Sequence, residues 1–353
     1  MDKTNSLVLT FDVEDFTKNV SLRALTILLK LLKRYDLKSL FFVTGYMAET
    51  LKKYPDILQL LEDHEIGYHS SSHSVRPIIP EFTDTRRYSK AVEISLIRET
   101  SHINPLTGEP EEEGGIKILR EIFNNKEVVS FRAPGFCWTP PHLEALQKLG
   151  IKYDFSAKLH GIGLLSGDKI AFKGTIFYPF PTYVDFWENP FRLISLFSSN
   201  LSKRKIVCLS SHEWLLASPK PWDSVYWRNN PKDLTSNSKD HNLRIVPNFL
   251  RFDTFLKGIK VLEKFKILKV TPFLGGRKSK PLDASCVDVA KTFHFSMRWA
   301  EHFFNYNPRY VLSHFYRYFD RHNVDYMSVH GSDETRPHSP WFRDDSSSLI
   351  GQS

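Results

Sequence analysis

The sequence predicts an α/β protein built on a parallel β-sheet, and two features of the chain lead to that prediction. Short apolar segments alternate with segments whose apolar residues recur at helical spacing, eight times or nearly so. The short segments are apolar on both faces, as is typical of parallel strands that helices cover on either side. Such strands form a closed barrel or an open sheet, and in either case the active site lies past their C-terminal ends.

Each predicted strand is an apolar run bounded by polar or turn-forming residues. In chain order the strands cover residues 7–11, 39–44, 66–68, 128–131, 151–155, 176–180, 206–210 and 267–271. Ser21 is placed to cap the first helix, and Pro55 opens another. The helix that Pro140 begins is closed by Gly150, and a last helix over 252–265 precedes the final strand.

Three regions depart from this alternation and set the expected domains. Residues 74–127 are interpreted as an insertion with loops, and 218–248 as a long loop over the mouth of the barrel. Beyond residue 280 the composition shifts toward aromatic and basic residues. We expect a catalytic barrel over 1–278, an aromatic-rich helical extension over 279–330 and a disordered tail over 331–353.

The composition is that of a folded chain of ordinary polarity. Apolar residues make up 41% and charged residues 25%, which argues against a disordered or membrane-embedded protein. No run approaches the roughly 18 uninterrupted apolar residues that a membrane-spanning helix needs. The N-terminus leads directly into a strand-like segment, so no signal peptide is expected. Three distant cysteines, Cys137, Cys208 and Cys286, suit a reducing cytosol, and we expect a cytoplasmic protein.

The formal net charge of +8 fits a mildly basic protein or one with an anionic partner: a membrane surface, a phosphate-linked substrate or a nucleic acid. The aromatic and basic segment 293–319, expected to be helical and interrupted at Pro308, would suit peripheral association with the inner face of a membrane. We favour the simpler interpretation that this segment packs its aromatic rings on the barrel. No basic run with interleaved aromatics precedes residue 293, so no nucleic-acid partner is expected.

Acidic and histidine side chains follow two of the predicted strands. Residues 12–15 (Asp-Val-Glu-Asp) place three carboxylates after the first strand, a clustering that a bound cation or a base role rewards. Residues 69–73 (His-Ser-Ser-Ser-His) follow the third strand, and their two imidazoles face one cation if the segment makes a helical turn. Alone, the first pattern also fits an exposed acidic turn and the second a chance pair.

Three further strand ends carry polar groups. Arg132 ends the fourth predicted strand, and the Pro-Gly that follows it supplies backbone N–H groups outside a ladder. These are parts of a carboxylate clamp and an oxyanion hole. Asp154 ends the fifth strand, and His212 follows the strand over 206–210. Each also fits a structural turn, but five such groups rarely gather by chance at the strand ends of one parallel fold.

In this order, the five groups resemble the five motifs of the polysaccharide deacetylases, carbohydrate esterase family 4. The family's first motif usually reads Thr-Phe-Asp-Asp-Gly, and residues 10–15 (Thr-Phe-Asp-Val-Glu-Asp) look like the variant branch with a spaced acid pair. The resemblance covers roughly residues 5–275. It implies a distorted (β/α)7 barrel with one divalent metal ion at its mouth, here followed by a C-terminal helical extension.

The resemblance also implies roles for the matching residues. Asp12 would be the catalytic base, held by Arg132, and His212 would be the general acid, oriented by Asp154. The implied metal ligands are Glu14, His69 and His73, with Asp15 as the alternative to Glu14. The implied oxyanion and substrate contacts are Gly135, Phe136 and Trp214.

The chemistry of these groups agrees with amide hydrolysis. A divalent ion can lower the pKa of a bound water from about 15.7 to about 7 and polarise a carbonyl oxygen. Two imidazoles and one carboxylate leave coordination positions open. This donor set favours Zn²⁺, with manganese, iron, cobalt and nickel as alternatives. A separate base and acid should then have pKa values that their surroundings push apart.

The expected enzyme is therefore a metal-dependent hydrolase that removes an N-acetyl group from an amino sugar by attack of a metal-bound water. Its substrate would be a polysaccharide or a lipid-linked or nucleotide-linked glycan. The alternative is a hydrolase of the same fold that acts on a small non-sugar amide, a ureide or a cyclic imide. A non-enzymatic binding protein is disfavoured, because none of the expected metal-binding or catalytic groups is missing.

Overall fold

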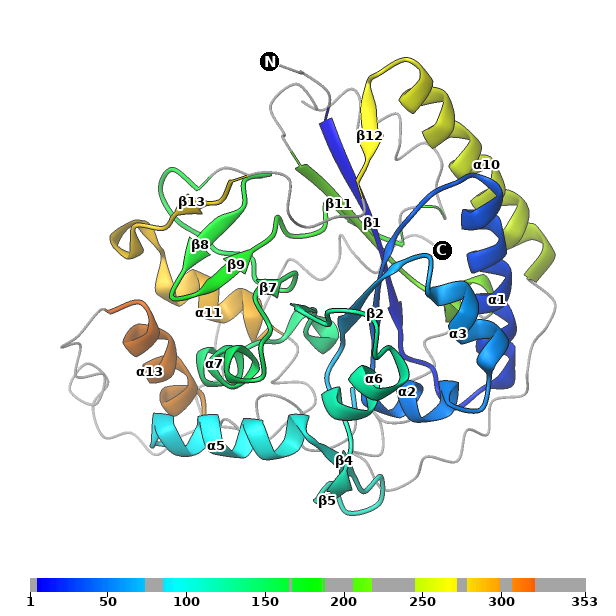
Figure 1. The fold of residues 1–353 in the computed structure, drawn as a ribbon. Coiled ribbons are helices and arrows are strands. Elements are labelled where there is room, and N and C mark those ends of the chain that lie inside the picture. Colours follow the sequence, from blue (N-terminus) through cyan, green and yellow to red (C-terminus); the bar gives the residue numbers. More distant parts are fainter. Residues whose placement is uncertain are drawn as a thin grey trace.

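The main feature of the fold is a curled, largely parallel β-sheet (Figure 1). The computed structural model describes residues 5–73, 85–164, 167–185, 187, 206–217, 245–271, 278–298 and 307–320. The strand order is β10-β11-β1-β2-β3-β6-β7-β9-β8-β13, and β12 also pairs with β1. Of these pairings only β8 with β9 is antiparallel. The predicted α/β class with a parallel barrel-type sheet is confirmed; within the described residues no ladder joins β10 to β13, so the curl stays open.

The strands of the sheet follow the predicted apolar runs closely. They are β1 (Asn5–Val13), β2 (Leu40–Val43), β3 (Glu65–Tyr68), β6 (Ser130–Phe131), β7 (Tyr153–Asp154), β8 (Ile170–Phe172), β9 (Thr175–Phe177), β10 (Tyr183–Val184), β11 (Ile206–His212), β12 (Leu268–Val270) and β13 (Lys280–Pro281). The predicted strands had no counterpart for β8, β10 and β13, which are two or three residues long. β6 and β7 are as short, but they lie within the longer apolar runs 128–131 and 151–155, whereas no such run surrounds β8, β10 or β13.

β1 lies at the centre of the sheet and positions the site. Its residues from Leu7 to Val13 are buried, since neighbouring strands lie on both edges and helices cover the sheet. On one side β1 pairs with β11, in a register that sets Asp12 opposite His212. On its other side β1 pairs with β12 near its start and with β2 near its end. The C-terminal ends of β1 and β11 therefore meet at one edge of the sheet.

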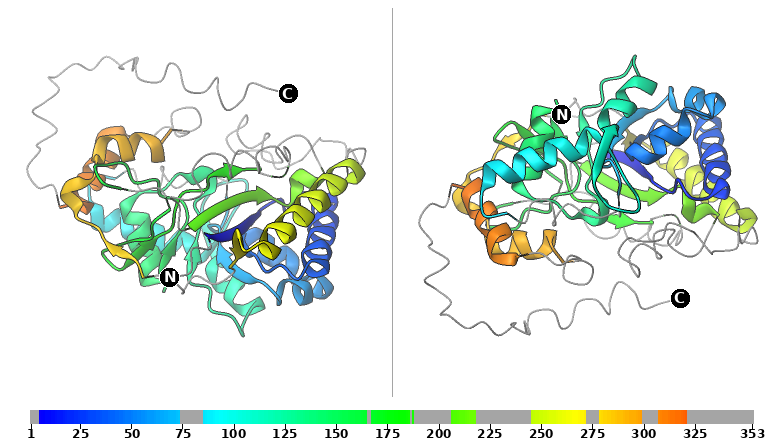
Figure 2. Two further views of the ribbon diagram at one scale, coloured as in Figure 1. Left: turned by 90° about the horizontal axis from the view of Figure 1, so that it is seen from above. Right: turned by 90° about the horizontal axis from the view of Figure 1, so that it is seen from below.

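Helices cover the sheet on both flanks (Figure 1). They are α1 (Asn19–Arg34), α2 (Gly45–Leu51), α3 (Pro55–Leu61), α5 (Tyr88–Glu99), α6 (Ile116–Ile122), α7 (Pro140–Lys148), α10 (Ile245–Lys264), α11 (Val289–Ser296) and α13 (Pro308–Tyr318), with short 3-10 turns η1 (Pro134–Phe136), η3 (Trp214–Leu216) and η5 (Ala284–Cys286). α1 and α10 lie on one flank, while α7, α11 and α13 lie on the other, as both views of Figure 2 show. None of the helices in the described ranges has the length and apolar character to cross a membrane.

The structure differs from the sequence predictions at the first helix and in the region 74–127. Ser21 does not cap α1, which begins at Asn19; its hydroxyl instead donates to the Asp15 carboxylate at 2.5 Å. The region 74–127, expected to be an insertion with loops, contains α5, α6 and a hairpin of β4 (Ser101–Ile103) and β5 (Pro110–Glu113) wherever it is described. Residues 245–248, expected at the end of the long loop 218–248, instead begin α10. The described residues do not include 218–244 or the predicted tail 331–353.

The segment after residue 278 packs directly on the barrel. β13 pairs with β8 in the main sheet, and α11 and α13 add their apolar residues to the main hydrophobic core. The Phe315 ring on α13 lies 5.0 Å from the ring of Trp138. Pro308 begins α13, with Asn307 as its N-cap, as expected of a proline in the first turn. The packing agrees with the favoured interpretation of this aromatic segment.

Candidate active site

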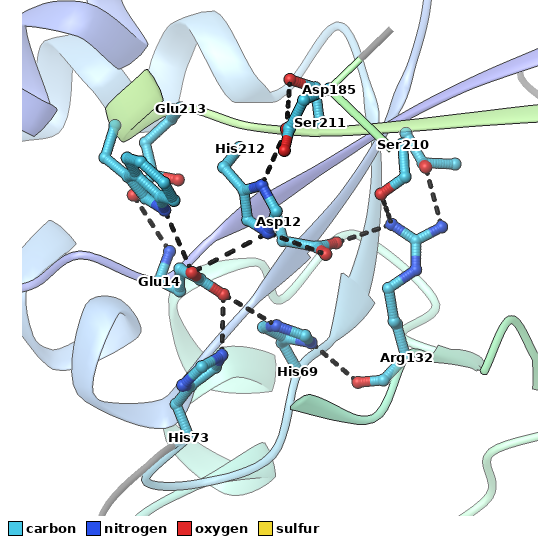
Figure 3. A network of polar contacts seen from close by, with 12 residues as sticks. Asp12, Glu14, His69, His73, Arg132, Asp185, Ser210, Ser211, His212 and Glu213 are labelled. Carbon is cyan, nitrogen blue, oxygen red and sulfur yellow. Dashed lines mark hydrogen bonds and ion pairs between the residues drawn. The ribbon is translucent and has the colours of Figure 1, made fainter. Parts of the chain in front are cut away.

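Polar side chains from five strands meet at the C-terminal edge of the sheet (Figure 3). They follow β1, β3, β6, β10 and β11, as parallel strands that share one edge require. The sequence-predicted residues brought together there are Asp12, Glu14, His69, His73, Arg132 and His212. Asp185, which the sequence analysis did not single out, joins them.

Three buried side chains form a group able to hold a metal ion. One ligand atom from each of Glu14, His69 and His73 lies within 4.8 Å of the others. Glu14 Oε2 is 3.1 Å from His69 Nε2 and 2.8 Å from His73 Nε2. Burial alone would raise the pKa of the Glu14 carboxyl, but the nearby His73 and His212 and the hydrogen bonds of the two imidazoles hold it well below its ordinary value.

Glu14, rather than its alternative Asp15, faces the two imidazoles. The Asp15 carboxylate turns the other way and accepts hydrogen bonds from the Thr17 backbone and hydroxyl and from Ser21. Both residues lie just past the end of β1, and their side chains point to different sides. Glu14, and not Asp15, is therefore the carboxylate beside the two imidazoles.

The two histidines converge without the helical turn that their spacing suggested. Ser70 and His73 both have positive φ, at 64° and 50°, and no helix spans the segment. His69 Nδ1 lies 2.8 Å from the carbonyl oxygen of Arg132. Because a carbonyl can only accept, Nδ1 carries a proton, and this hydrogen bond orients the ring with Nε2 toward Glu14. This arrangement is typical of a metal-ligating histidine.

A buried hydrogen-bond network holds residues 69–73, which we call the histidine loop. Glu99, at the end of α5, accepts hydrogen bonds from the Ser71 backbone N–H at 3.0 Å and from the Tyr68 hydroxyl at 2.5 Å. Its other oxygen lies 2.7 Å from His142 Nε2 on α7. The histidine loop is thus held by a carboxylate from the insertion, which no pattern in the sequence indicated.

Asp12 is paired with a buried guanidinium. Arg132 Nη1 donates to Asp12 Oδ1 at 2.7 Å and to the Ser210 hydroxyl at 2.8 Å, and Nη2 donates to the Thr10 hydroxyl at 2.8 Å. The guanidinium also lies over the Phe42 ring, 4.4 Å from its centroid. These contacts fix the guanidinium beside the Asp12 carboxylate.

His212 stands opposite this pair, and its partner corrects the sequence analysis. Its Nδ1 lies 3.0 Å from Asp185 Oδ1, whereas its Nε2 faces Asp12 Oδ2 at 3.9 Å. Asp154, expected to orient His212, instead accepts hydrogen bonds from the backbone N–H groups of Ser156 and Ala157. Asp154 ends β7, several strands away from β11 in the sheet, whereas Asp185 follows β10, the immediate neighbour of β11.

The charge around His212 favours its protonated form. Burial alone would lower the pKa of the imidazole, but the carboxylates of Asp185, Glu14 and Asp12 hold it well above its ordinary value. Asp185 is itself positioned through Ser211, whose hydroxyl donates to it at 3.3 Å and accepts from the indole N–H of Trp187 at 2.8 Å. In the sequence, only the two apolar residues before it, Tyr183 and Val184, indicate that Asp185 follows a strand.

Glu213 and Trp214 hold the first motif in place. Glu213 Oε1 accepts the backbone N–H groups of Glu14 and Asp15 at 3.1 and 2.9 Å. Burial, with the charge of Glu14, raises the pKa of the Glu213 carboxyl well above its ordinary value. The indole N–H of Trp214, expected to face substrate, donates to Glu14 Oε1 at 3.1 Å.

The loop after Arg132 is also fixed by its backbone. The Ala133 N–H donates to the Ser156 hydroxyl, and the Phe136 N–H donates to the Ala133 carbonyl. Gly135 and Phe136 both have positive φ, at 55° and 58°, a conformation that glycine adopts readily and phenylalanine rarely. That Gly135 and Phe136 contact an oxyanion or substrate stays a prediction.

Residues 2–153 match the family model described as polysaccharide deacetylase. No curated protein matches the chain. Solved structures similar in fold include a Streptococcus mutans CE4 esterase, with 14% identity, 74% of this chain and 84% of that chain covered, and a TM-score of 0.40. A family 4 carbohydrate esterase from Streptomyces lividans shows 12% identity, coverage of 78% and 97%, and a TM-score of 0.37. A 4-alpha-glucanotransferase from Thermococcus litoralis shows 12% identity, coverage of 84% and 46%, and a TM-score of 0.48.

Proposed function

Because the chain belongs, through residues 2–153, to the polysaccharide deacetylase family, we propose that it is a metal-dependent enzyme that removes the N-acetyl group from an amino sugar in a glycan. The family's members are hydrolases that act on carbon–nitrogen bonds. One observation carries the proposal: a buried group of two imidazoles and a carboxylate lies beside a second carboxylate, Asp12, that has its own arginine.

The donor set suits a divalent cation. Glu14, His69 and His73 would hold it, and the tautomer of His69 fits that use because its Nδ1–H is already engaged by the Arg132 carbonyl. When bound, such an ion supplies Lewis-acid polarisation of the amide carbonyl and an acidified water. We propose Zn²⁺, which two nitrogens and one carboxylate oxygen suit well.

The protein's own groups divide the proton transfers between them. Asp12, paired with Arg132, is the proposed base that takes a proton from the attacking water. His212, whose pKa its three carboxylate neighbours raise, is the proposed acid that gives a proton from Nε2 to the departing nitrogen. Asp185 accepts the Nδ1–H of His212 and so keeps Nε2 aimed at the site. The base and the acid are thus separate groups with different surroundings, as an acid–base pair requires.

The proposal is tested by following acetate release from N-acetylchitotetraose. We expect wild-type protein to release acetate, exhaustive chelation to abolish the release, and added Zn²⁺ to restore it. His69→Ala should lose both zinc content and activity, whereas Asp12→Asn should retain zinc and lose activity by a factor of about 10² to 10⁴. The exposed Lys30→Ala, on α1, is the control. Full activity after chelation would overturn the proposal, and ring opening of a cyclic imide without acetate release from any sugar would favour the small-amide alternative.

A further inference from the structure

Three neighbouring parallel strands carry an aromatic and basic cluster on the loops that follow them. Phe136 follows β6, Lys158 follows β7 and Phe180 follows β9, and these strands are adjacent in the sheet. The Phe136 and Phe180 rings lie 4.7 Å apart, and the Lys158 ammonium lies 5.9 Å from the Phe180 ring. Because β6 also ends in Arg132, the cluster lies at the same edge of the sheet as the candidate active site.

The C-terminal extension completes this cluster. Phe295 on α11 packs on Phe180, with ring centroids 5.2 Å apart, and the Lys158 ammonium lies 4.7 Å from the Phe295 ring. Arg298, just past α11, places its guanidinium 4.2 Å from the Phe295 ring and 6.0 Å from the Phe136 ring. A segment far from the active-site motifs in the sequence thus adds a cation to the rim of the site.

The Phe136 ring of the cluster lies beside Arg132, the partner of Asp12. The guanidinium of Arg132, which binds Asp12, lies 5.8 Å from the centroid of Phe136, and that of Arg298 lies 6.0 Å from the same centroid. Phe136 is therefore a direct neighbour of both guanidinium groups.

The cations of the cluster repel one another. Lys158 and Arg298 both lie beside the Phe295 ring, and the charges of Arg298 and of Lys291 on α11 act on Lys158. Partial burial and then the charges of Arg298 and Lys291 lower the pKa of Lys158. Within the described ranges, no carboxylate lies within salt-bridge distance of Lys158. Cations gathered beside half-buried rings gain most from a ligand that brings the opposite charge.

We propose that Lys158 and Arg298 form an anion subsite that binds a phosphate group attached to the acetylated sugar. The half-buried rings of Phe136, Phe180 and Phe295 would pack against the sugar, while the two cations bind the phosphate. The inference rests on the proposed deacetylase function and names the substrate class of that site. A sugar linked to a nucleoside diphosphate and a sugar linked to a polyprenyl diphosphate share this chemistry, so the experiment includes both.

The test compares kcat/KM for three substrates with the same N-acetylglucosamine unit. They are neutral N,N′-diacetylchitobiose, UDP-N-acetylglucosamine and polyprenyl diphosphate-linked N-acetylglucosamine in detergent. Because the charge-assisted hydrogen bond to the phosphate would be lost, Lys158→Gln should lower kcat/KM for the preferred phosphate substrate about 10-fold or more. Its effect on the neutral substrate should stay within about 2-fold. The control, Lys30→Gln, makes the same change at an exposed position on α1, on the opposite flank, and should alter neither value.

Arg298→Gln is the second variant, because Arg298 also packs on two rings and its loss could disturb the extension. A thermal melt equal to that of the wild type, together with a selective loss on the phosphate substrate, would support the subsite. Added NaCl should reproduce the selective loss in the wild type, since salt screens charges at the surface. Equal losses on neutral and phosphate substrates, or a wild type that prefers the neutral one, would overturn the inference. Acetate release from none of the three would overturn the proposed function itself, and the inference with it.

Discussion

At the scale of single residues, the carboxylates of the site have different surroundings. Asp12 faces a buried guanidinium, and Glu14 faces two imidazoles. Burial and the charge of Glu14 raise the pKa of Glu213, although its Oε1 accepts two backbone N–H groups, which lower it. These surroundings therefore disfavour a further negative charge on Glu213 beside Glu14.

Asp154 offers a test of such a pKa shift away from the metal-binding residues. Burial raises the pKa of this carboxyl to about 6, although its Oδ1 accepts two backbone N–H groups. Since its pKa in an unfolded chain is about 3.9, the group stabilises the fold below about pH 4, and this contribution is lost as the pH rises to about 6. Asp154→Asn keeps the accepting oxygen and cannot ionise.

We therefore expect the free energy of unfolding of the wild type to fall, relative to that of Asp154→Asn, by up to about 3 kcal/mol between pH 4 and pH 7. Urea denaturation of both proteins at several pH values measures the difference. Parallel profiles across this range would show that Asp154 is ionised in the folded protein with an ordinary pKa, contrary to the expectation.

The site residues that could be predicted follow strands with a clear apolar pattern, and the one that was missed does not. Asp12, Glu14, His69 and Arg132 lie at or just past the ends of strands with clear apolar patterns, so their meeting could be predicted. Asp185 follows the two-residue strand β10, which leaves no such pattern, and Asp154 was placed at His212 in its stead. Which of two strand-end acids meets an imidazole depends on strand order, and local sequence does not encode that order.

At the scale of elements, the strands and long helices could be predicted, whereas the insertion could not. β1 to β3 and the helices between them follow apolar runs that pack in one core. α5 carries a much weaker amphipathic pattern than α1, and its role depends on one side chain at its end. That side chain, Glu99, connects α5 to α7 through His142 and to the histidine loop through Ser71.

We predict that Glu99→Leu loosens the histidine loop. The change removes the acceptor of the Ser71 N–H and the Tyr68 hydroxyl and the partner of His142, all buried. Leaving such groups unsatisfied costs about 1–3 kcal/mol each. We expect a free energy of unfolding lowered by about 3 kcal/mol or more and a zinc affinity lowered about 10-fold, measured by urea denaturation and by competition with a chromophoric chelator.

Glu99→Gln is the matched control, since its amide can accept from the Tyr68 hydroxyl and the Ser71 N–H and donate to His142. It should retain most of the stability and zinc affinity. If Glu99→Leu lost stability but bound zinc as tightly as the wild type, the network would hold the fold alone and would not position the histidine loop.

At the scale of the whole molecule, the extension and the barrel share one hydrophobic core. Val311, Leu312 and Phe315 of α13 belong to the same buried cluster as the residues of β1 and α1. Phe172, on β8, lies against Tyr318 and Phe319, while β8 itself pairs with β13. The sequence divides the chain by composition near residue 278, but packing across that boundary links the two parts energetically.

This packing predicts that barrel and extension unfold together. Phe315 is fully buried against Trp138 and Phe293, so Phe315→Ala should cost about 3–5 kcal/mol. In calorimetry we expect one unfolding transition in the wild type and one, at a lower Tm, in the variant, while Leu250→Ala, at a position 63% exposed on α10, should leave Tm almost unchanged. Two transitions, of which only one shifts in Phe315→Ala, would show that the extension is an independent unit. In that case its cations would be delivered to the rim of the active site by a separately folding segment, and loss of the extension would leave the barrel intact.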